Sequence, residues 1–387
     1  MTSLLPSGHF TWAPTRDAAL ARVATVSPSA YGRTRNALDG AVTRLSPWIT
    51  HGFVDLPEVL AAVRERHRVP SGDRFVFELA WREYFHHVWR HLGEGIFGNL
   101  RLPVWAGEYS ASVPEDVRTA CTGVPVIDAS VRQLYATGYL HNHQRLWLAA
   151  YVVHLRKVHW FAGAQWMYAH LLDGDLASNC LSWQWCAGTF SSKPYLFNAE
   201  NVARYAPHLA SPGTAVDRPY PELDMLARTR PDVGPESGRR PVPVSEPSCP
   251  AGPGVPDTAL TADDLTGRRI GLVHPWSLRA PSDCDLILGV IHKPFHDRFA
   301  WSALRWDFVL GGMRPLVRHI WMGDLAELAG MLQRAASVTG VATLNPGYAA
   351  FMGASGHGVV PVPRITADPD APCRSFSAFW SRVSRGL

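Results

Sequence analysis

Residues 173–190, DGDLASNCLSWQWCAGTF, place two carboxylates and an amide among tryptophans. If a helix begins directly after Asp175, then Asp175, Asn179 and Trp183 share one helical face, because residues four apart lie above one another. Asp173 lies just before this helix start, where the helix dipole favours a carboxylate, so one of the two acids is explained without any function. Asp173 and Asp175 together, beside an amide and indoles, suit a neutral, nitrogen-rich ring system that carries hydrogen-bond donors.

The stretch 138–155, GYLHNHQRLWLAAYVVHL, contains a second set of polar side chains. Asn142 and Arg145 are three residues apart, so a helix would place them on one face. His141 and His143 are two residues apart and would point to different sides, which disfavours a metal site built on this pair. The spacing therefore places Asn142 and Arg145 together on one helical face, and we expect no metal.

The stretch 75–92, FVFELAWREYFHHVWRHL, has large apolar residues at helical spacing. This pattern is typical of a helix that faces a core. Glu78 and Arg82 are one turn apart, in the order that favours an ion pair. Such a pair is usually solvated, but Phe75 and Trp81 flank this one. A partly buried, functional position for the pair is therefore an equal alternative.

The composition limits the class of protein. The chain has 387 residues, of which 47% are hydrophobic and 18% charged, and it has fifteen tryptophans. These values indicate a soluble globular protein of one or two domains. A formal net charge of +4 permits nucleic-acid binding without requiring it. No run approaches the ~20 apolar residues of a membrane span, and the N-terminal MTSLLPSGHFTW lacks a signal-peptide pattern. We expect a cytoplasmic protein without a membrane partner.

The composition and the hydrophobic periodicity of the chain change twice. Residues 30–210 are rich in tryptophan and helical in period, whereas residues 206–256 carry twelve prolines and predict a semi-extended linker without packed elements. Beyond the linker, short apolar strands alternate with helices, which favours a parallel sheet. The predicted strands are RIGLVHP, CDLILGVI and HIWMG, and the predicted helices are SALRWDFVLGGM and LAELAGMLQRAA.

These patterns predict a mainly α protein, in which an all-helical domain precedes a smaller α/β domain with a Rossmann-like parallel sheet. The predicted parts are an N-terminal extension (1–29), the helical domain (30–210), the Pro-rich linker (211–265) and the α/β domain (266–387).

Several separate blocks carry a family resemblance. TRLSP, ELAWRE, VPVIDASVRQLYATGYLHN and DGDLASN followed by WQW occur in an order that resembles the FAD-binding helical domain of the DNA photolyase and cryptochrome family, over about residues 30–205. The resemblance implies FAD as cofactor. RIGLVHPWSL and CRSFSAFWSRVSR are similar to parts of the α/β domain that usually comes first in this family. We therefore interpret the chain as circularly permuted, and we leave open whether it holds an antenna chromophore.

The resemblance also assigns roles to single residues. The residues that it assigns to the FAD phosphates are Tyr31, Thr43, Arg44, Leu45 and Ser46. This assignment agrees with the affinity of a helix N-terminus for anions. Residues at the flavin are Arg82, Asn142, Arg145, Asp173 and Asp175, with Phe75 standing where many photolyases have Trp. Arg145 is expected to pair with Asp173, and Asn179 to face the flavin N5.

The resemblance further predicts an electron-transfer chain and a substrate pocket. Trp183 and Trp160 match the first two electron donors, and Trp105 matches the third. Glu78, Trp81 and Trp185 match the pocket that receives a flipped pyrimidine dimer.

Three functions follow from these assignments. The leading one is light-driven repair of pyrimidine dimers in DNA, catalysed by a photolyase-like lyase. A cryptochrome-like photosensor would need the tryptophan chain but not the dimer pocket. A flavoenzyme could also act on a small molecule in the same pocket. His143 stands where a DNA-facing Arg is frequent in the family, and Leu146 stands where a Met touches the lesion. The cofactor pocket is therefore better supported than the DNA contacts, and the oligomeric state stays open.

Overall fold

The computed structural model describes residues 12–229, 233–236, 241–250, 252–253, 260–354 and 356–387. The remaining residues, which include most of the predicted N-terminal MTSLLPSGHFTW and parts of the Pro-rich linker, lie outside this description. The described residues form two compact units. The helical unit comprises Ser29–Val42 and His91–Pro247, and the mixed unit comprises Trp12–Pro28, Thr43–Arg90 and Ser248–Leu387.

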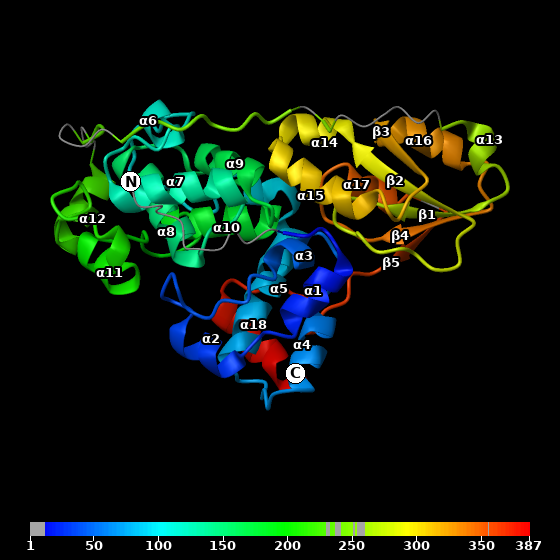
Figure 1. Ribbon diagram of the computed structural model, residues 1–387, viewed down its shortest axis with the longest axis horizontal. Coiled ribbons are helices and arrows are strands. Elements are labelled where there is room, and N and C mark those ends of the chain that lie inside the picture. Colours follow the sequence, from blue (N-terminus) through cyan, green and yellow to red (C-terminus); the bar gives the residue numbers. More distant parts are fainter. Residues whose placement is uncertain (1–11, 230–232, 237–240, 251, 254–259, 355) are drawn as a thin grey trace. The chain divides into compact units, whose positions relative to one another are not determined.

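The helical unit consists of α-helices joined by turns and loops (Figure 1). Its α-helices are α2 (Pro28–Thr34), α6 (Glu115–Arg118), α7 (Pro125–Thr137), α8 (Asn142–Ala150), α9 (Trp160–His170), α10 (Leu176–Ala187), α11 (Ala199–Tyr205) and α12 (Tyr220–Arg228). Single turns of other helix types are η1 (Gly93–Phe97), η2 (Tyr151–Leu155) and η3 (Pro207–Leu209). Among the described residues, no helix is both long enough and apolar enough to cross a membrane.

The core of the helical unit lies where α10 packs against α8 and α9. Trp147 and Tyr151 are fully buried there. The helix α7 has Pro125 in its first turn and ends at Gly138, whose positive φ of 64° suits glycine. The carbonyl of Gly138 then accepts a hydrogen bond from the backbone N–H of Leu172. This bond fixes the loop that leads into α10.

The Pro-rich segment is more ordered than the sequence suggested. The prediction of a stretch without packed elements is wrong for α12, because Leu223 and Ala227 of this helix are buried. Further along the chain, the backbone N–H of Val244 donates a hydrogen bond to the backbone carbonyl of Thr119. A carboxylate oxygen of Glu246 lies 2.8 Å from a guanidinium nitrogen of Arg118. The segment before Pro247 is therefore held against the helical unit.

The mixed unit contains a parallel sheet, as predicted. Its strands are β1 (Arg269–Val273), β2 (Leu286–His292), β3 (His319–Gly323), β4 (Ser337–Val341) and β5 (His357–Val360), in the order β3-β2-β1-β4-β5. One helix precedes the first strand and four lie between later strands: α13 (Ala262–Leu265), α14 (Lys293–Arg298), α15 (Ala303–Met313), α16 (Leu325–Leu332) and α17 (Tyr348–Met352). In β1 and β2 nearly every residue is buried, which explains their continuous apolar runs.

The mixed unit also contains helices from both ends of the chain. These are α1 (Arg16–Val23), α3 (Ser46–Thr50), α4 (Leu56–Arg64), α5 (Arg74–Leu92), α18 (Phe376–Val383) and the turn η4 (Ser384–Gly386). The helices α5 and α18 lie side by side (Figure 1) through ring contacts of Phe77 and Trp81 with Phe376.

A polar stripe on α5 holds the segment between β5 and α18. The Glu83 carboxylate accepts hydrogen bonds from the backbone N–H groups of Ile365 (2.7 Å) and Thr366 (3.0 Å). One turn later, His87 lies 2.8 Å from the Asp368 carboxylate. Because Glu83 and His87 are buried, their partners keep this connection in a defined position on α5.

Candidate functional site

Asp175 caps the start of α10. Its side chain accepts hydrogen bonds from the backbone N–H (2.8 Å) and the hydroxyl (2.6 Å) of Ser178. The predicted helix start is confirmed, and the cap explains why the carboxylate is ordered although only 6% of the residue is exposed. Burial raises the pKa of the neighbouring Cys180 thiol, and the Asp175 charge adds to this effect. Cys180 therefore stays protonated and unreactive.

Asp173 forms the predicted ion pair with Arg145. One guanidinium nitrogen of Arg145 donates to the carboxylate at 2.7 Å, and its Nε donates to the Leu140 carbonyl at 3.0 Å. Burial alone would lower the pKa of Arg145, but the Asp173 carboxylate outweighs this effect and raises it. Only 3% of the Asp173 side chain is exposed, compared with 26% for Arg145. The Arg145 guanidinium is therefore charged, and its bonds to Asp173 and Leu140 hold it in one orientation.

Asn179 lies one turn after Asp175 on α10. Its amide nitrogen donates to the Ala164 carbonyl on α9 at 2.9 Å, and 9% of the residue is exposed. Because the nitrogen is engaged, the amide oxygen is the end that can accept a hydrogen bond from a ligand. The side chain is thus an oriented acceptor.

Two of the predicted electron donors are buried on adjacent helices. Trp183 on α10 is 2% exposed, and Trp160 at the start of α9 is 3% exposed. The Trp183 ring packs on Gly163, where an added Cβ would lie 2.4 Å from the ring. Gly163 therefore leaves the space that the indole occupies. The Trp160 indole N–H donates to the side-chain oxygen of Asn99 at 2.6 Å.

Trp105, the predicted third donor, is half-buried in the loop before α6. Its ring centroid lies 5.1 Å from that of Tyr109 and 5.1 Å from the ammonium nitrogen of Lys157. This loop has no regular structure, in contrast to the helices that carry Trp183 and Trp160.

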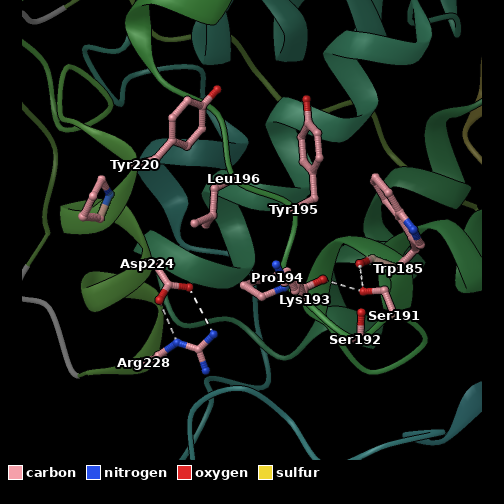
Figure 2. Close-up of a pocket in the computed structure, with 11 residues that line it drawn as sticks. Trp185, Ser191, Ser192, Lys193, Pro194, Tyr195, Leu196, Tyr220, Asp224 and Arg228 are labelled. Atoms are coloured by element: carbon pink, nitrogen blue, oxygen red, sulfur yellow. Dashed lines mark hydrogen bonds and ion pairs between the residues drawn. The ribbon is translucent and has the colours of Figure 1, made fainter.

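Trp185 lines a surface pocket of about 730 Å³ in the helical unit (Figure 2). It is 39% exposed, and its ring lies 5.4 Å from that of Tyr195. Tyr220 on α12 adds a third aromatic side chain to the lining. The pocket also contains Lys193 and an ion pair formed by Asp224 and Arg228. It therefore combines aromatic surface with positive charge.

Two further predicted residues belong to the helical unit. Tyr31 is half-buried on α2. Asn142 is exposed as the first residue of α8, where the ring of His141 caps the helix by accepting from the His143 backbone N–H at 3.1 Å. The face shared by Asn142 and Arg145 begins at this cap.

The predicted phosphate segment lies in the mixed unit. Arg44 has a positive φ of 53°, which is uncommon for a residue with a side chain. The carbonyl of Thr43 accepts from the Arg22 guanidinium at 2.6 Å. Leu45 is buried, and Ser46 is the first residue of α3.

The predicted residues on α5 also belong to the mixed unit. Phe75 is buried at 1% exposure, and Arg82 is half-buried. Glu78 forms an ion pair with Arg74 at 2.7 Å, one turn before it. One face of the Trp81 ring is stacked on Phe376. The apolar stripe of this helix therefore packs against α18, as expected of a core-facing helix.

Sequence reasoning missed several residues around these side chains. Asn99 contacts Trp160, and Lys157 contacts Trp105. Both residues lie outside helices, so helical spacing could not predict them. Glu83 and His87 are four residues apart on α5, and this spacing could have indicated their shared polar face.

Part of the chain is similar in sequence to known proteins. Residues 75–231 match the family described as the FAD binding domain of DNA photolyase. A deoxyribodipyrimidine photo-lyase of Streptomyces griseus is 30% identical over 194 residues, which are 46% of this chain and 42% of that protein. A cryptochrome DASH of Gloeobacter violaceus is 30% identical over 211 residues, 52% of this chain and 41% of that protein. The chain thus spans about two fifths of the length of these curated relatives.

A solved structure of a cryptochrome from Synechocystis sp. PCC6803 is 27% identical with a TM-score of 0.45, over 50% of this chain and 43% of that one. The region of the chain that these comparisons place in the photolyase/cryptochrome family is residues 75–231, the FAD-binding region. The parallel sheet of the chain follows this region, which is the order expected for the permuted arrangement.

Proposed function

We propose that this chain binds FAD and uses light to split pyrimidine dimers in DNA by electron transfer. The observation that carries the proposal is the family match over residues 75–231, which contains the ordered group formed by Asp173, Arg145, Asp175 and Asn179. A photo-lyase and cryptochromes DASH are among the relatives at about 30% identity, so repair and light sensing are both relevant activities.

The polar side chains around the start of α10 fit a flavin. An isoalloxazine ring offers N–H donors and carbonyl acceptors along its edge. Asn179 supplies an oriented amide oxygen that can accept from an N–H, and Arg145 supplies a fixed cation for oxygen or ring-nitrogen acceptors. Asp173 would hold Arg145 in place. When bound, FAD would supply the light absorption and the transferable electron.

Trp183 and Trp160 would serve as electron donors. An indole can give up an electron without first losing a proton, and both rings are buried in the helical unit. The packing of Trp183 on Gly163 would keep its ring in one position. Replacing Trp183 with Phe should therefore leave FAD bound and slow the photoreduction of oxidised flavin.

Trp185 and its pocket would contact the DNA. An enzyme that acts on a base must take that base out of the stack, and a damaged base is extruded at lower cost. A protein that binds single-stranded DNA needs aromatic side chains that stack on the bases and cations that pair with the phosphates. Trp185 is exposed enough to meet a base, and Lys193 lines the same pocket.

The deciding experiment is irradiation of purified, flavin-loaded protein with single-stranded DNA that contains cyclobutane dimers, with loss of dimers as the readout. The preparation should be yellow, and the released flavin should be FAD. A colourless protein that FAD cannot reconstitute would overturn the flavin assignment. A yellow protein that leaves dimers intact would overturn repair alone.

A light sensor is the second candidate. It is favoured by the contact between Trp81 and Phe376, whose rings are 3.9 Å apart and inclined by 8°. This stacking covers one face of a residue that the family resemblance assigns to the dimer pocket. A sensor would photoreduce FAD through Trp183 and leave dimers unrepaired, so the same irradiation distinguishes the two candidates.

A further inference from the structure

The ring contacts of Trp105 lead through a tyrosine. Trp105 and Tyr109 have centroids 5.1 Å apart, Tyr109 and His159 are 6.4 Å apart, and His159 and Trp160 are 5.8 Å apart. Tyr109 therefore lies between Trp105 and the start of α9, where Trp160 is buried. The sequence did not point to Tyr109, because it lies in an irregular loop.

The backbone keeps Tyr109 at this position. The N–H of the following residue, Ser110, donates to the Lys157 carbonyl at 2.8 Å, and the Ser110 carbonyl accepts from the His159 N–H at 2.8 Å. These two bonds form a short parallel bridge between the loop and the residues just before Trp160. Tyr109 is therefore attached directly to the segment that leads into α9.

A cation faces Trp105. The ammonium nitrogen of Lys157 lies 5.1 Å from the centroid of the indole, and it donates to the carbonyls of Leu226 and Ala227 at 2.8 Å each. These two bonds fix the charge at the end of α12. Burial lowers the pKa of Lys157 to about 8, so the group is still mainly protonated at pH 7. A neutral indole is stabilised by this cation, whereas an oxidised, positively charged indole is repelled by it.

Tyr109 does not suffer from this repulsion. A phenol that loses an electron also loses its proton and becomes a neutral radical. Burial raises the pKa of Tyr109, so the phenol is protonated at pH 7. The residue is only half-buried, and the acceptor that we assign to the released proton is water.

We propose that Tyr109, and not Trp105, is the terminal electron donor of the chain that begins with Trp183 and Trp160. The inference rests on the proposed flavin photochemistry and goes beyond the family resemblance, which pointed to Trp105. In the step, one electron passes from the Tyr109 phenol to the oxidised indole of Trp160, which returns to neutral tryptophan. The phenolic O–H bond breaks, its proton goes to water, and a neutral tyrosyl radical remains.

The test compares radicals in illuminated, flavin-loaded protein by electron paramagnetic resonance and transient absorption. The parent protein should accumulate a tyrosyl radical. Tyr109→Phe should lose it, whereas Trp105→Phe should retain it. Tyr135→Phe is the matched control, because Tyr135 is another half-buried tyrosine of the helical unit. Adding Lys157→Met to Tyr109→Phe should produce a long-lived tryptophanyl radical that disappears when Trp105 is also replaced by Phe.

A second readout does not need flavin. Azide radicals generated by pulse radiolysis oxidise tryptophans of the flavin-free protein, and electron transfer from tyrosine to the oxidised indoles is then followed in time. Tyr109→Phe should remove one kinetic phase that Trp105→Phe leaves in place. This arm works even if the protein binds no FAD, so failure of the proposed function and failure of the Tyr109 assignment are distinguishable. A tyrosyl signal that survives in Tyr109→Phe, or that disappears in Trp105→Phe, overturns the proposal.

Discussion

Trp81 lies flat against Phe376, with ring centroids 3.9 Å apart and an interplanar angle of 8°. The two residues come from α5 and α18, which are separated by most of the chain. Phe77 makes an edge contact with the same phenylalanine at 4.7 Å. The C-terminal helix therefore covers the aromatic face of α5, and Phe376 is the centre of this contact.

Phe376→Ala should destabilise the protein by about 3–5 kcal/mol, the usual cost of truncating a buried phenylalanine. Phe376 is 5% exposed, so the lost contacts would leave a cavity against α5. Urea unfolding measures the change. Val360→Ala is the control, because Val360 is 52% exposed and should stay within about 0.5 kcal/mol of the parent. Equal stability of Phe376→Ala and the parent would show that α18 does not stabilise α5.

Glu83→Gln should loosen the segment that leads to α18. The glutamate is 4% exposed and accepts from the backbone N–H groups of Ile365 and Thr366. Glutamine replaces one of these acceptors by a donor, at a cost of about 1–3 kcal/mol. Limited proteolysis should then cut faster between residues 361 and 373. Glu65→Gln changes an exposed glutamate of the same unit and should leave the cleavage rate unaltered; if both variants are cut at the same rate, the polar stripe has no anchoring role.

Asp173→Asn should lower the FAD content of the purified protein. The substitution keeps the shape of the side chain but removes the charge that pairs with Arg145. Breaking a buried pair costs about 3–5 kcal/mol, so a thermal melt must accompany the flavin absorbance. Asp224→Asn breaks the exposed pair with Arg228 and should keep full FAD content. Full FAD content in a folded Asp173→Asn protein would remove Asp173 and Arg145 from the flavin site.

Trp185→Ala should weaken binding of dimer-containing DNA by about ten-fold, since stacking on an aromatic side chain contributes about 1–3 kcal/mol per base. Trp185 is a cleaner test than Trp81, because it is 39% exposed and its loss should not disturb the core. Fluorescence anisotropy with a labelled oligonucleotide measures the affinity. Met225→Ala, in the same unit and 57% exposed, is the control. Unaltered affinity in Trp185→Ala would argue for the sensor.

His154 should make the stability of the protein depend on pH. Its ring is fully buried and lies 2.8 Å from the Cys186 carbonyl, and burial lowers its pKa to about 4. An unfolded histidine has a pKa of about 6.5. Between these values the unfolded state binds more protons, so the free energy of unfolding falls as the pH falls.

The contribution of His154 between pH 7 and pH 5 should be about 2 kcal/mol. Urea unfolding at both pH values, in the parent and in His154→Gln, isolates this part from the titration of carboxylates. The glutamine can still donate to Cys186 but does not titrate. The same change at His208, an exposed residue of the helical unit, should preserve the parent's pH dependence. A parent and a His154→Gln variant with the same pH dependence would contradict the assignment.

Local signals predicted much of the structure. The start of α10 at Leu176 and the apolar runs of β1 and β2 are properties of short stretches, and each of these elements forms where it was expected. The capping carboxylate is that of Asp175, whereas the sequence suggested Asp173 for the position before the helix. The helix α12 was missed because prolines surround it. It is stabilised by tertiary contacts, including the two bonds from Lys157 to its last turn.

The candidate site was predictable only in part. The Arg145–Asp173 pair was expected and forms. The partner of Trp81 could not be deduced, because Phe376 is distant in the sequence and ring stacking has no spacing rule. The position of Lys157 over Trp105 likewise depends on how two loops pack. Periodicity shows which face of a helix is apolar, but not which segment will cover it.

The pairing of α5 with α18 has a consequence for synthesis of the protein on the ribosome. A chain grows at about 5–20 residues per second, so α5 leaves the ribosome about 15–60 s before α18 is complete. During that interval Phe77 and Trp81 lack the ring that covers them in the folded protein. Nascent chains should therefore depend on a chaperone that shields aromatic surface, and this dependence should end only when Phe376 has emerged.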